Sequence, residues 1–217
     1  MSGAPVVFEN VIQRSFALLI FVLALFSPAY AQSPMNGTGQ GMASLKSGNT
    51  AGALEAFNKA IAVDHNDAVA YLDRAIAYAD LKKLPEAISD TTQAIEIDPK
   101  NAAAYYLRGS IYYAQGQGMA AIADFSQAIA LKPKVSKGYM SRALTYLRED
   151  DPQKAAADLT KVEELNPKYG HAYYNLAVAY YQLKQYNKAW EQVHKAQELG
   201  VAINPKFIDS LKEAAVK

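Results

Sequence analysis

Hydrophobic side chains recur along this chain in a pattern that repeats every 34 residues. Within a repeat, a second tyrosine follows the first after seven residues, which is two helical turns and places both rings on one helix face. A small residue stands at the eighth place and an alanine at the twentieth, so that two helices can approach closely. The repeated tyrosines are Tyr71, Tyr105, Tyr139 and Tyr173 at the fourth place and Tyr78, Tyr112, Tyr146 and Tyr180 at the eleventh. The pattern predicts one helical hairpin per repeat.

Prolines fix the repeat boundaries, because Pro99, Pro133 and Pro167 are 34 residues apart. The complete units predicted from them are 68–101, 102–135, 136–169 and 170–203. Residues 32–67 are predicted to form a flexible leader and a degenerate first unit. Gly37, Gln40 and Gly41 stand at its first-helix positions, and each glycine costs about 1 kcal/mol relative to alanine within a helix. We expect that first helix to be short or frayed.

The segment 204–217 follows the last unit and has the signature of one more helix. Asn204 followed by Pro205 is a helix-start signal, and apolar residues follow at helical spacing. These apolar residues are Phe207, Ile208, Leu211 and Ala215. We expect this helix to cap the open apolar face of the last unit, as repeat arrays require for solubility.

The 34-residue pattern resembles the tetratricopeptide repeat, over about residues 34–203. The resemblance implies an all-α fold: a right-handed α-solenoid of helix-turn-helix repeats with the C-terminal capping helix. It also implies a concave groove, lined by places two, five, nine, twelve and thirteen of each unit, that holds a peptide or a helix of a partner. The groove residues implied in this way are Leu72, Ile76, Tyr106, Tyr113, Met140, Leu144, Leu147, Tyr174, Val178 and Tyr181.

An apolar and aromatic groove favours a protein partner, because tyrosine binds through its ring while its hydroxyl stays wet. The alternative is that neighbouring units or the chain's own termini cover these rings. The carboxylate clamp of this family uses lysine at the fifth place and asparagine at the ninth, and this chain has neither residue at those places in its complete units. We therefore do not expect that clamp here.

An arginine stands at the seventh place of three units, and an aspartate follows it sixteen residues later. The three combinations are Arg74 with Asp90, Arg108 with Asp124, and Arg142 with Asp158. In the last unit Leu176 and Gln192 replace both members together. A basic row for a ligand would not need an aspartate at a fixed distance, so we predict three ion pairs that join first helix to second.

Composition and charge favour no enzymatic or nucleic-acid function. Lys plus Arg (22) and Asp plus Glu (21) nearly cancel over the 217 residues, and no global field would attract nucleic acid. His65, His171 and His194 lack metal-ligand spacing. We expect a chain that is not an enzyme and binds no cofactor or metal.

Residues 1–31 have the pattern of a secretory signal peptide, with Arg14 before the apolar run 16–26 and small residues before Gln32. The apolar run is shorter than the roughly 20 residues that span a bilayer. We predict cleavage after Ala31 and a periplasmic product, soluble and without disulfides because the chain has no cysteine. The alternative is an uncleaved segment that anchors the protein to the membrane.

Two functions remain open from the sequence. The first is a non-enzymatic scaffold of the cell envelope that binds a peptide segment or a helix of a partner in the groove. The second is a structural subunit or assembly factor of a larger envelope or membrane complex, which docks by its convex face or its N-terminal region.

Overall fold

The computed structural model describes residues 37–215, in which eleven helices and no strands occur. The all-α prediction is confirmed for this part of the chain. The helices are α3 Gly37–Lys46, α4 Thr50–Val63, α5 Ala68–Asp80, α6 Leu84–Ile97, α7 Ala102–Ala114, α8 Gly118–Leu131, α9 Ser136–Arg148, α10 Pro152–Leu165, α11 Gly170–Gln182, α12 Tyr186–Glu198 and α13 Pro205–Ala215. The predicted signal segment 1–31 and the leader up to residue 36 lie outside the described residues.

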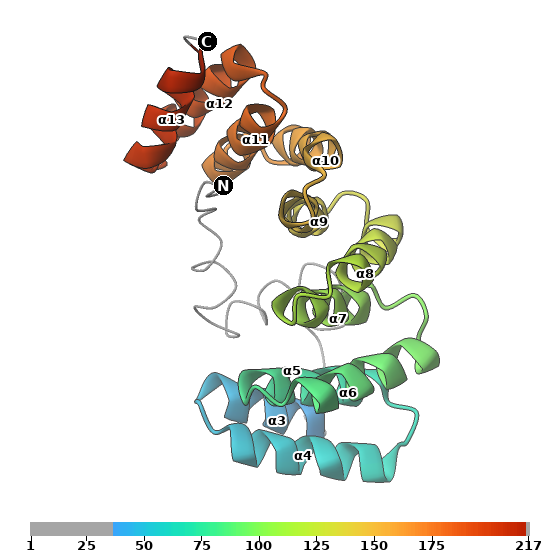
Figure 1. The fold of residues 1–217 in the computed structure, drawn as a ribbon. Helices are drawn as coiled ribbons and strands as arrows, with labels where there is room; N and C mark the ends of the chain where they lie inside the picture. Colours follow the sequence, from blue (N-terminus) through green and yellow to red (C-terminus); the bar gives the residue numbers. More distant parts are fainter. Residues whose placement is uncertain (1–36, 216–217) are drawn as a thin grey trace. The chain divides into compact units, whose positions relative to one another are not determined.

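The helices divide into two compact units, at 37–133 and 134–215. In the first unit, α3–α4, α5–α6 and α7–α8 are antiparallel pairs, and α4 also contacts α5 as α6 contacts α7 (Figure 1). In the second unit, α9–α10 and α11–α12 pair in the same way, and α13 packs against α12. Within each unit, neighbouring helical pairs share an apolar face, which is why one pair alone would not be stable.

Every hairpin turn bends through one residue in the left-handed backbone region. Gly48 and Gly116 occupy this place in two hairpins, whereas Lys82, Asp150 and Lys184 adopt φ of 60°, 59° and 59° in the others. The following residue donates its backbone N–H to the carbonyl of the eleventh-place residue, as Gln185 N does to Tyr180 O at 2.8 Å. The turn geometry is thus shared, although the residue that makes the turn is not.

The small residues at the eighth and twentieth places lie buried between the two helices of each pair, as their spacing predicts. Gly41 in α3 illustrates the tight fit, because a Cβ added there would overlap the Phe57 ring of α4. The sequence suggested that glycines weaken this helix, and α3 is helical from Gly37, the first described residue, to Lys46. Gly41 is nevertheless required where it stands, because only glycine leaves room for the phenylalanine.

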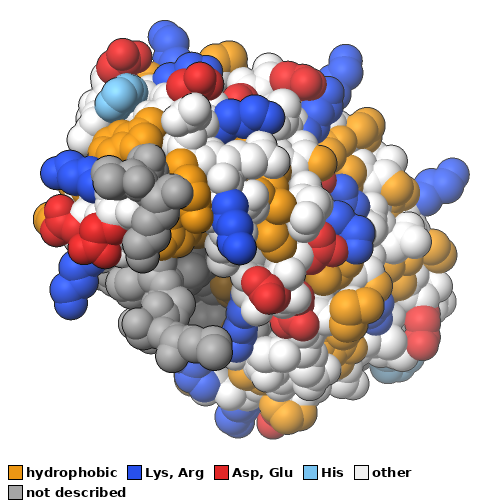
Figure 2. Space-filling model, turned by 45° about the horizontal axis from the view of Figure 1, so that its top comes forward, with side chains coloured by type: hydrophobic (Ala, Val, Ile, Leu, Met, Phe, Trp, Pro, Cys, Tyr) orange, Lys and Arg blue, Asp and Glu red, His pale blue; other side chains and the backbone are white. Residues whose placement is uncertain are grey.

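Among residues 37–215, no helix combines the length and the apolar character needed to cross a bilayer. Lys and Arg side chains are spread over the face shown in Figure 2 and intermix with acidic ones. This distribution agrees with the near-zero net charge of the sequence.

Candidate functional site

The three arginines each make a two-pronged ion pair with the aspartate sixteen residues ahead. Arg74 Nε and Nη2 donate to Asp90 Oδ2 and Oδ1, both at 2.8 Å. Arg108 with Asp124 and Arg142 with Asp158 repeat this geometry at 2.8–2.9 Å. The aspartate side chains are 6–9% exposed and the arginine side chains 18–20% exposed. Each pair therefore joins α5 to α6, α7 to α8, or α9 to α10 in a partly dry setting.

A further arginine donor reaches back to the second helix of the preceding hairpin. Arg74 Nη1 donates to Asn58 Oδ1 at 2.7 Å, and Arg108 Nη1 donates to Thr92 Oγ1 at 3.1 Å. The sequence reasoning missed this link, although polar residues sixteen positions before each of these arginines were its signal. Arg74 and Arg108 thus each bond to two second helices and link one hairpin to the next.

The repeated tyrosines flank the arginines. The Arg74 guanidinium carbon lies 5.5 Å from the centroid of the Tyr71 ring and 5.8 Å from that of Tyr78. Such cation–π contacts stabilise a charge that has lost part of its water. The hydrogen bond to Asp90 raises the pKa of Arg74 above its ordinary value, against an opposing effect of burial. All groups on this face are engaged with one another, so the arginine row belongs to the scaffold.

The last hairpin lacks the ion pair and shows what replaces it. Leu176 is buried, and Gln192, at the aspartate place, leaves its buried Oε1 without a hydrogen bond. Lys188 Nζ lies 5.4 Å from the Tyr180 ring and Lys195 Nζ lies 5.6 Å from the Tyr173 ring. The tyrosines of this hairpin therefore take their cations from α12.

Glu163 of α10 stands next to these tyrosines in an unfavourable setting. Burial raises the pKa of its carboxyl group, with Lys195 acting in the opposite direction. Its Oε1 is buried without a hydrogen-bond partner. Burial and the Glu163 charge together raise the pKa of Tyr173. The ionised Glu163 carboxylate therefore lowers the stability of the folded protein.

The groove residues of the unit 37–133 lie on first helices α5 and α7. Leu72 and Ile76 are each 1% exposed, and Tyr106 and Tyr113 are 7% and 8% exposed. The Tyr106 ring is tilted against Phe125 of α8, with centroids 5.6 Å apart. In this structure these side chains are buried and do not form an exposed apolar patch.

The groove residues of the unit 134–215 lie on α9 and α11, and all except half-buried Tyr181 are buried. The buried ones are Met140, Leu144, Leu147, Tyr174 and Val178. The two helices meet where Asn175 Nδ2 lies 3.9 Å from Met140 Sδ. Lys137, near the start of α9, has its pKa lowered by burial. This face is apolar, and a partly buried ammonium group stands at one end of it.

The prediction that Tyr174 and Tyr181 present free rings to a partner needs correction. Phe207 of α13 stands edge-on to both rings, with centroid distances of 5.7 Å to Tyr174 and 5.6 Å to Tyr181. Tyr181 also contacts Tyr186, at 5.8 Å. The alternative noted from the sequence, in which the chain's own terminus covers the rings, describes these two tyrosines. The physical reason is that α13 needs an apolar surface for Phe207 and Leu211.

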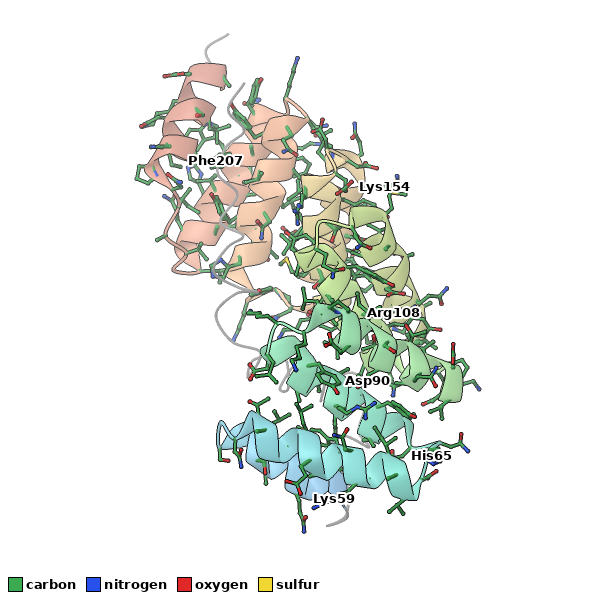
Figure 3. All side chains as sticks on the ribbon, turned by 60° about the horizontal axis from the view of Figure 1, so that its bottom comes forward. Lys59, His65, Asp90, Arg108, Lys154 and Phe207 are labelled. Atoms are coloured by element: carbon green, nitrogen blue, oxygen red, sulfur yellow. The ribbon has the colours of Figure 1, made fainter. Side chains whose placement is uncertain are left out.

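The described residues contain no group of three or more His, Cys, Asp or Glu side chains that would hold a metal ion. His65 lies in the turn after α4 (Figure 3), and His171 and His194 are exposed on α11 and α12. No nucleophile with an adjacent base is present among the side-chain contacts described above. The arrangement offers packing surfaces and ion pairs.

Three family models match separate stretches of the chain. One described as TPR repeat matches residues 77–116, and two described as tetratricopeptide repeat match residues 102–135 and 146–198. The prediction of tetratricopeptide repeats is thus confirmed. No curated protein matches the sequence.

Solved structures with the same fold include two proteins named MamA and YrrB. A crystal structure of MamA is 26% identical, covers 74% of this chain and 94% of its own, and has a TM-score of 0.70. A MamA structure from Desulfovibrio magneticus RS-1 is 20% identical, covers 74% of this chain and 90% of its own, and has a TM-score of 0.69. YrrB, described as a TPR protein with an unusual peptide-binding site, is 19% identical, covers 86% of this chain and 92% of its own, and has a TM-score of 0.68. These likenesses confirm the solenoid fold class.

Proposed function

We propose that this chain, which is built from tetratricopeptide repeats, is a non-enzymatic scaffold that binds a peptide segment or a helix of a partner protein along the inner faces of its first helices. The observation that carries the proposal is the composition of those faces. Places five, nine and twelve of the four complete units, on α5, α7, α9 and α11, hold mainly aliphatic and aromatic side chains. The repeated arginines on the adjacent face form ion pairs within the hairpins instead. The peptide-binding site named for YrrB supports the same kind of role.

The burial of these side chains sets a condition on binding. A partner reaches the Tyr174 ring only by replacing Phe207 of α13, whereas Tyr106 and Tyr113 offer it only their exposed edges. Exchange of one apolar cover for another costs little hydrophobic free energy, because the buried area is nearly conserved. The affinity then depends on how well the partner's side chains fit these faces.

The proposed place of action is the cell envelope, with residues 1–31 removed on export. The support is the sequence pattern of that segment. Intact-mass measurement of the protein purified from its native envelope tests it. A mass that begins at Gln32 supports export and cleavage, and a mass that includes residues 1–31 supports the anchored alternative.

Affinity purification of the tagged protein from the native envelope, followed by mass spectrometry, tests the binding role. The test variant combines Tyr106→Ala with Tyr113→Ala, and its control combines Tyr106→Phe with Tyr113→Phe. We expect the alanine variant to lose the partner and the phenylalanine variant to retain it, because the ring supplies most of the contact. Both variants must keep the helical circular dichroism of the parent chain.

Equal partner recovery by the folded alanine variant would refute binding at this face. Crosslinks confined to the second helices α4, α6 and α8 would then favour the structural-subunit function.

A further inference from the structure

The C-terminal helix α13 continues the 34-residue phase of the repeats. Asn204 stands at the first place of a next unit, so Phe207 takes the fourth place, where the complete units have tyrosine. Within the described residues no second helix follows α13. It stands in the phase of a first helix and packs against α12 at the end of the unit 134–215.

One stripe of α13 makes its apolar contacts. Phe207 is 2% exposed and Leu211, one helical turn later, is 0% exposed. Phe207 meets Tyr174 at an interplanar angle of 81° and Tyr181 at 71°, which is the edge-to-face arrangement that aromatic rings prefer. Figure 3 shows Phe207 on α13 among the neighbouring helices. After Pro205, the exposed residues of the helix are polar: Lys206, Asp209, Lys212 and Glu213.

The attachment of α13 depends on this stripe. Its polar contacts within residues 37–215 are its own, since Lys206 N donates to Asn204 Oδ1 at 3.0 Å and Lys212 Nζ lies 3.9 Å from Asp209 Oδ1. A helix of eleven residues is marginal in water without packing. The connection from α12 is non-helical over 201–204 and begins at Gly200, with φ of 79°. Such a segment is expected among the first parts of a fold to open.

We propose that α13 occupies, within the chain, the site of a partner helix, and that this partner is an amphipathic helix presenting a phenylalanine and a leucine four positions later. The inference rests on the proposed function and names its ligand. Tyr174 and Tyr181, which the resemblance to tetratricopeptide repeats assigns to partner binding, already contact such a helix. The side chains of Phe207 and Leu211 therefore indicate which residues of a partner helix this end of the binding face accepts.

The tether makes α13 a built-in competitor. A short flexible connection gives an effective concentration in the millimolar range. A partner helix present at micromolar concentration therefore displaces α13 only if it binds about 1,000-fold more tightly, or if the contacts of α13 are weakened. Removal of the Phe207 ring should weaken them selectively.

The test uses the full chain and a fluorescein-labelled synthetic peptide with the sequence of residues 203–217, measured by fluorescence anisotropy. We expect the Phe207→Ala chain to bind the peptide at least about tenfold more tightly than the parent chain, whose own helix blocks the site. A peptide with alanine in place of its phenylalanine should bind at least about tenfold more weakly. Lys212→Ala, on the polar side of α13, is the matched control and should behave as the parent chain.

Phe207→Leu guards against unfolding, because it keeps an apolar side chain while removing the aromatic contacts, and it should give an intermediate affinity. Equal peptide affinity for the folded parent and Phe207→Ala chains would overturn the inference. A parent-chain dimer in light scattering that Phe207→Ala converts to monomer would also overturn it, in favour of α13 exchange between copies. Partner capture that depends on Tyr106 and Tyr113 would survive either result, so failure here is distinguishable from failure of the proposed function.

Discussion

Gly109 and Phe125 fit each other across the hairpin of α7 and α8. A Cβ added to Gly109 would lie 3.0 Å from Cδ1 and Cε1 of the Phe125 ring, closer than side chains normally pack. The same two places hold Gly41 with Phe57 in the first hairpin, and alanine with leucine, Ala143 and Leu159, in the hairpin of α9 and α10. A large ring at one place thus accompanies a glycine at the other.

The fit predicts that Gly109→Ala destabilises the protein by about 1–3 kcal/mol, because the added methyl group overpacks the contact with Phe125. Phe125→Leu in the same chain should recover part of the loss, since alanine with leucine is the combination that α9 and α10 already use. Urea unfolding of both single variants and the double variant measures this. Additive single effects would contradict the pairing.

Asp90→Ala should lower the free energy of unfolding by about 3 kcal/mol, because the partly buried Arg74 guanidinium loses two hydrogen bonds and its counter-charge. Asn58→Ala removes only the neutral bond from Arg74 Nη1 and should cost about 1 kcal/mol. A double-mutant cycle on Arg74 and Asp90 isolates the pair. We expect a coupling well above that of the exposed pair of Lys59 and Glu55, which serves as the control.

Glu163 should make the protein less stable as the pH rises. Its folded-state pKa is raised by burial, so between the ordinary value of 4.5 and that raised value the folded state binds more protons than the unfolded state. The free energy of unfolding therefore falls as the pH rises through this window. Glu163→Gln should remove that slope and stabilise the protein at pH 7 by less than about 1 kcal/mol, given the screening of a half-exposed group.

Thermal unfolding at pH 4, 5, 6 and 7 checks the Glu163 prediction. Glu164→Gln is the matched control, because Glu164 is exposed and paired with Lys161 at 2.6 Å. A Glu163→Gln chain with the pH dependence of the parent would contradict the assignment.

Lys184→Gly should stabilise the turn between α11 and α12 by about 1 kcal/mol. Lys184 adopts φ of 59°, a conformation that costs a residue with a Cβ about 1–2 kcal/mol, and glycine avoids that cost with some loss of chain entropy. The reverse change, Gly116→Ala at the corresponding turn, should destabilise by a similar amount. The two midpoints of denaturant unfolding must move in opposite directions if the shared turn geometry is the cause.

The sequence predicted the ion pairs within each hairpin but not the hydrogen bonds between hairpins. Arginine and aspartate occur together in three units and are absent together from the last, so this sequence alone was enough to predict that they pair. The bonds from Arg74 to Asn58 and from Arg108 to Thr92 were not anticipated. They join successive hairpins, and their geometry depends on how one helical pair stacks on the next.

Gly41 is a second residue whose role only the tertiary structure explains. The propensity of glycine predicted a weak helix, whereas the packing shows that Phe57 requires it. Propensity is a local average, and a close contact between two particular helices overrides it.

The sequence by itself determined the helical hairpins, their 34-residue phase and the tetratricopeptide repeats, because each depends on a spacing that local helix geometry converts into one face. Only the tertiary structure decided which apolar faces are covered, since coverage depends on segments that are distant in the chain. Phe207 covers Tyr174 and Tyr181 through the docking of α13, whereas Tyr106 packs against Phe125 of α8, and nothing in the spacing of these tyrosines predicts which group covers each ring. Burial is a property of the packed chain, whereas periodicity is a property of the sequence.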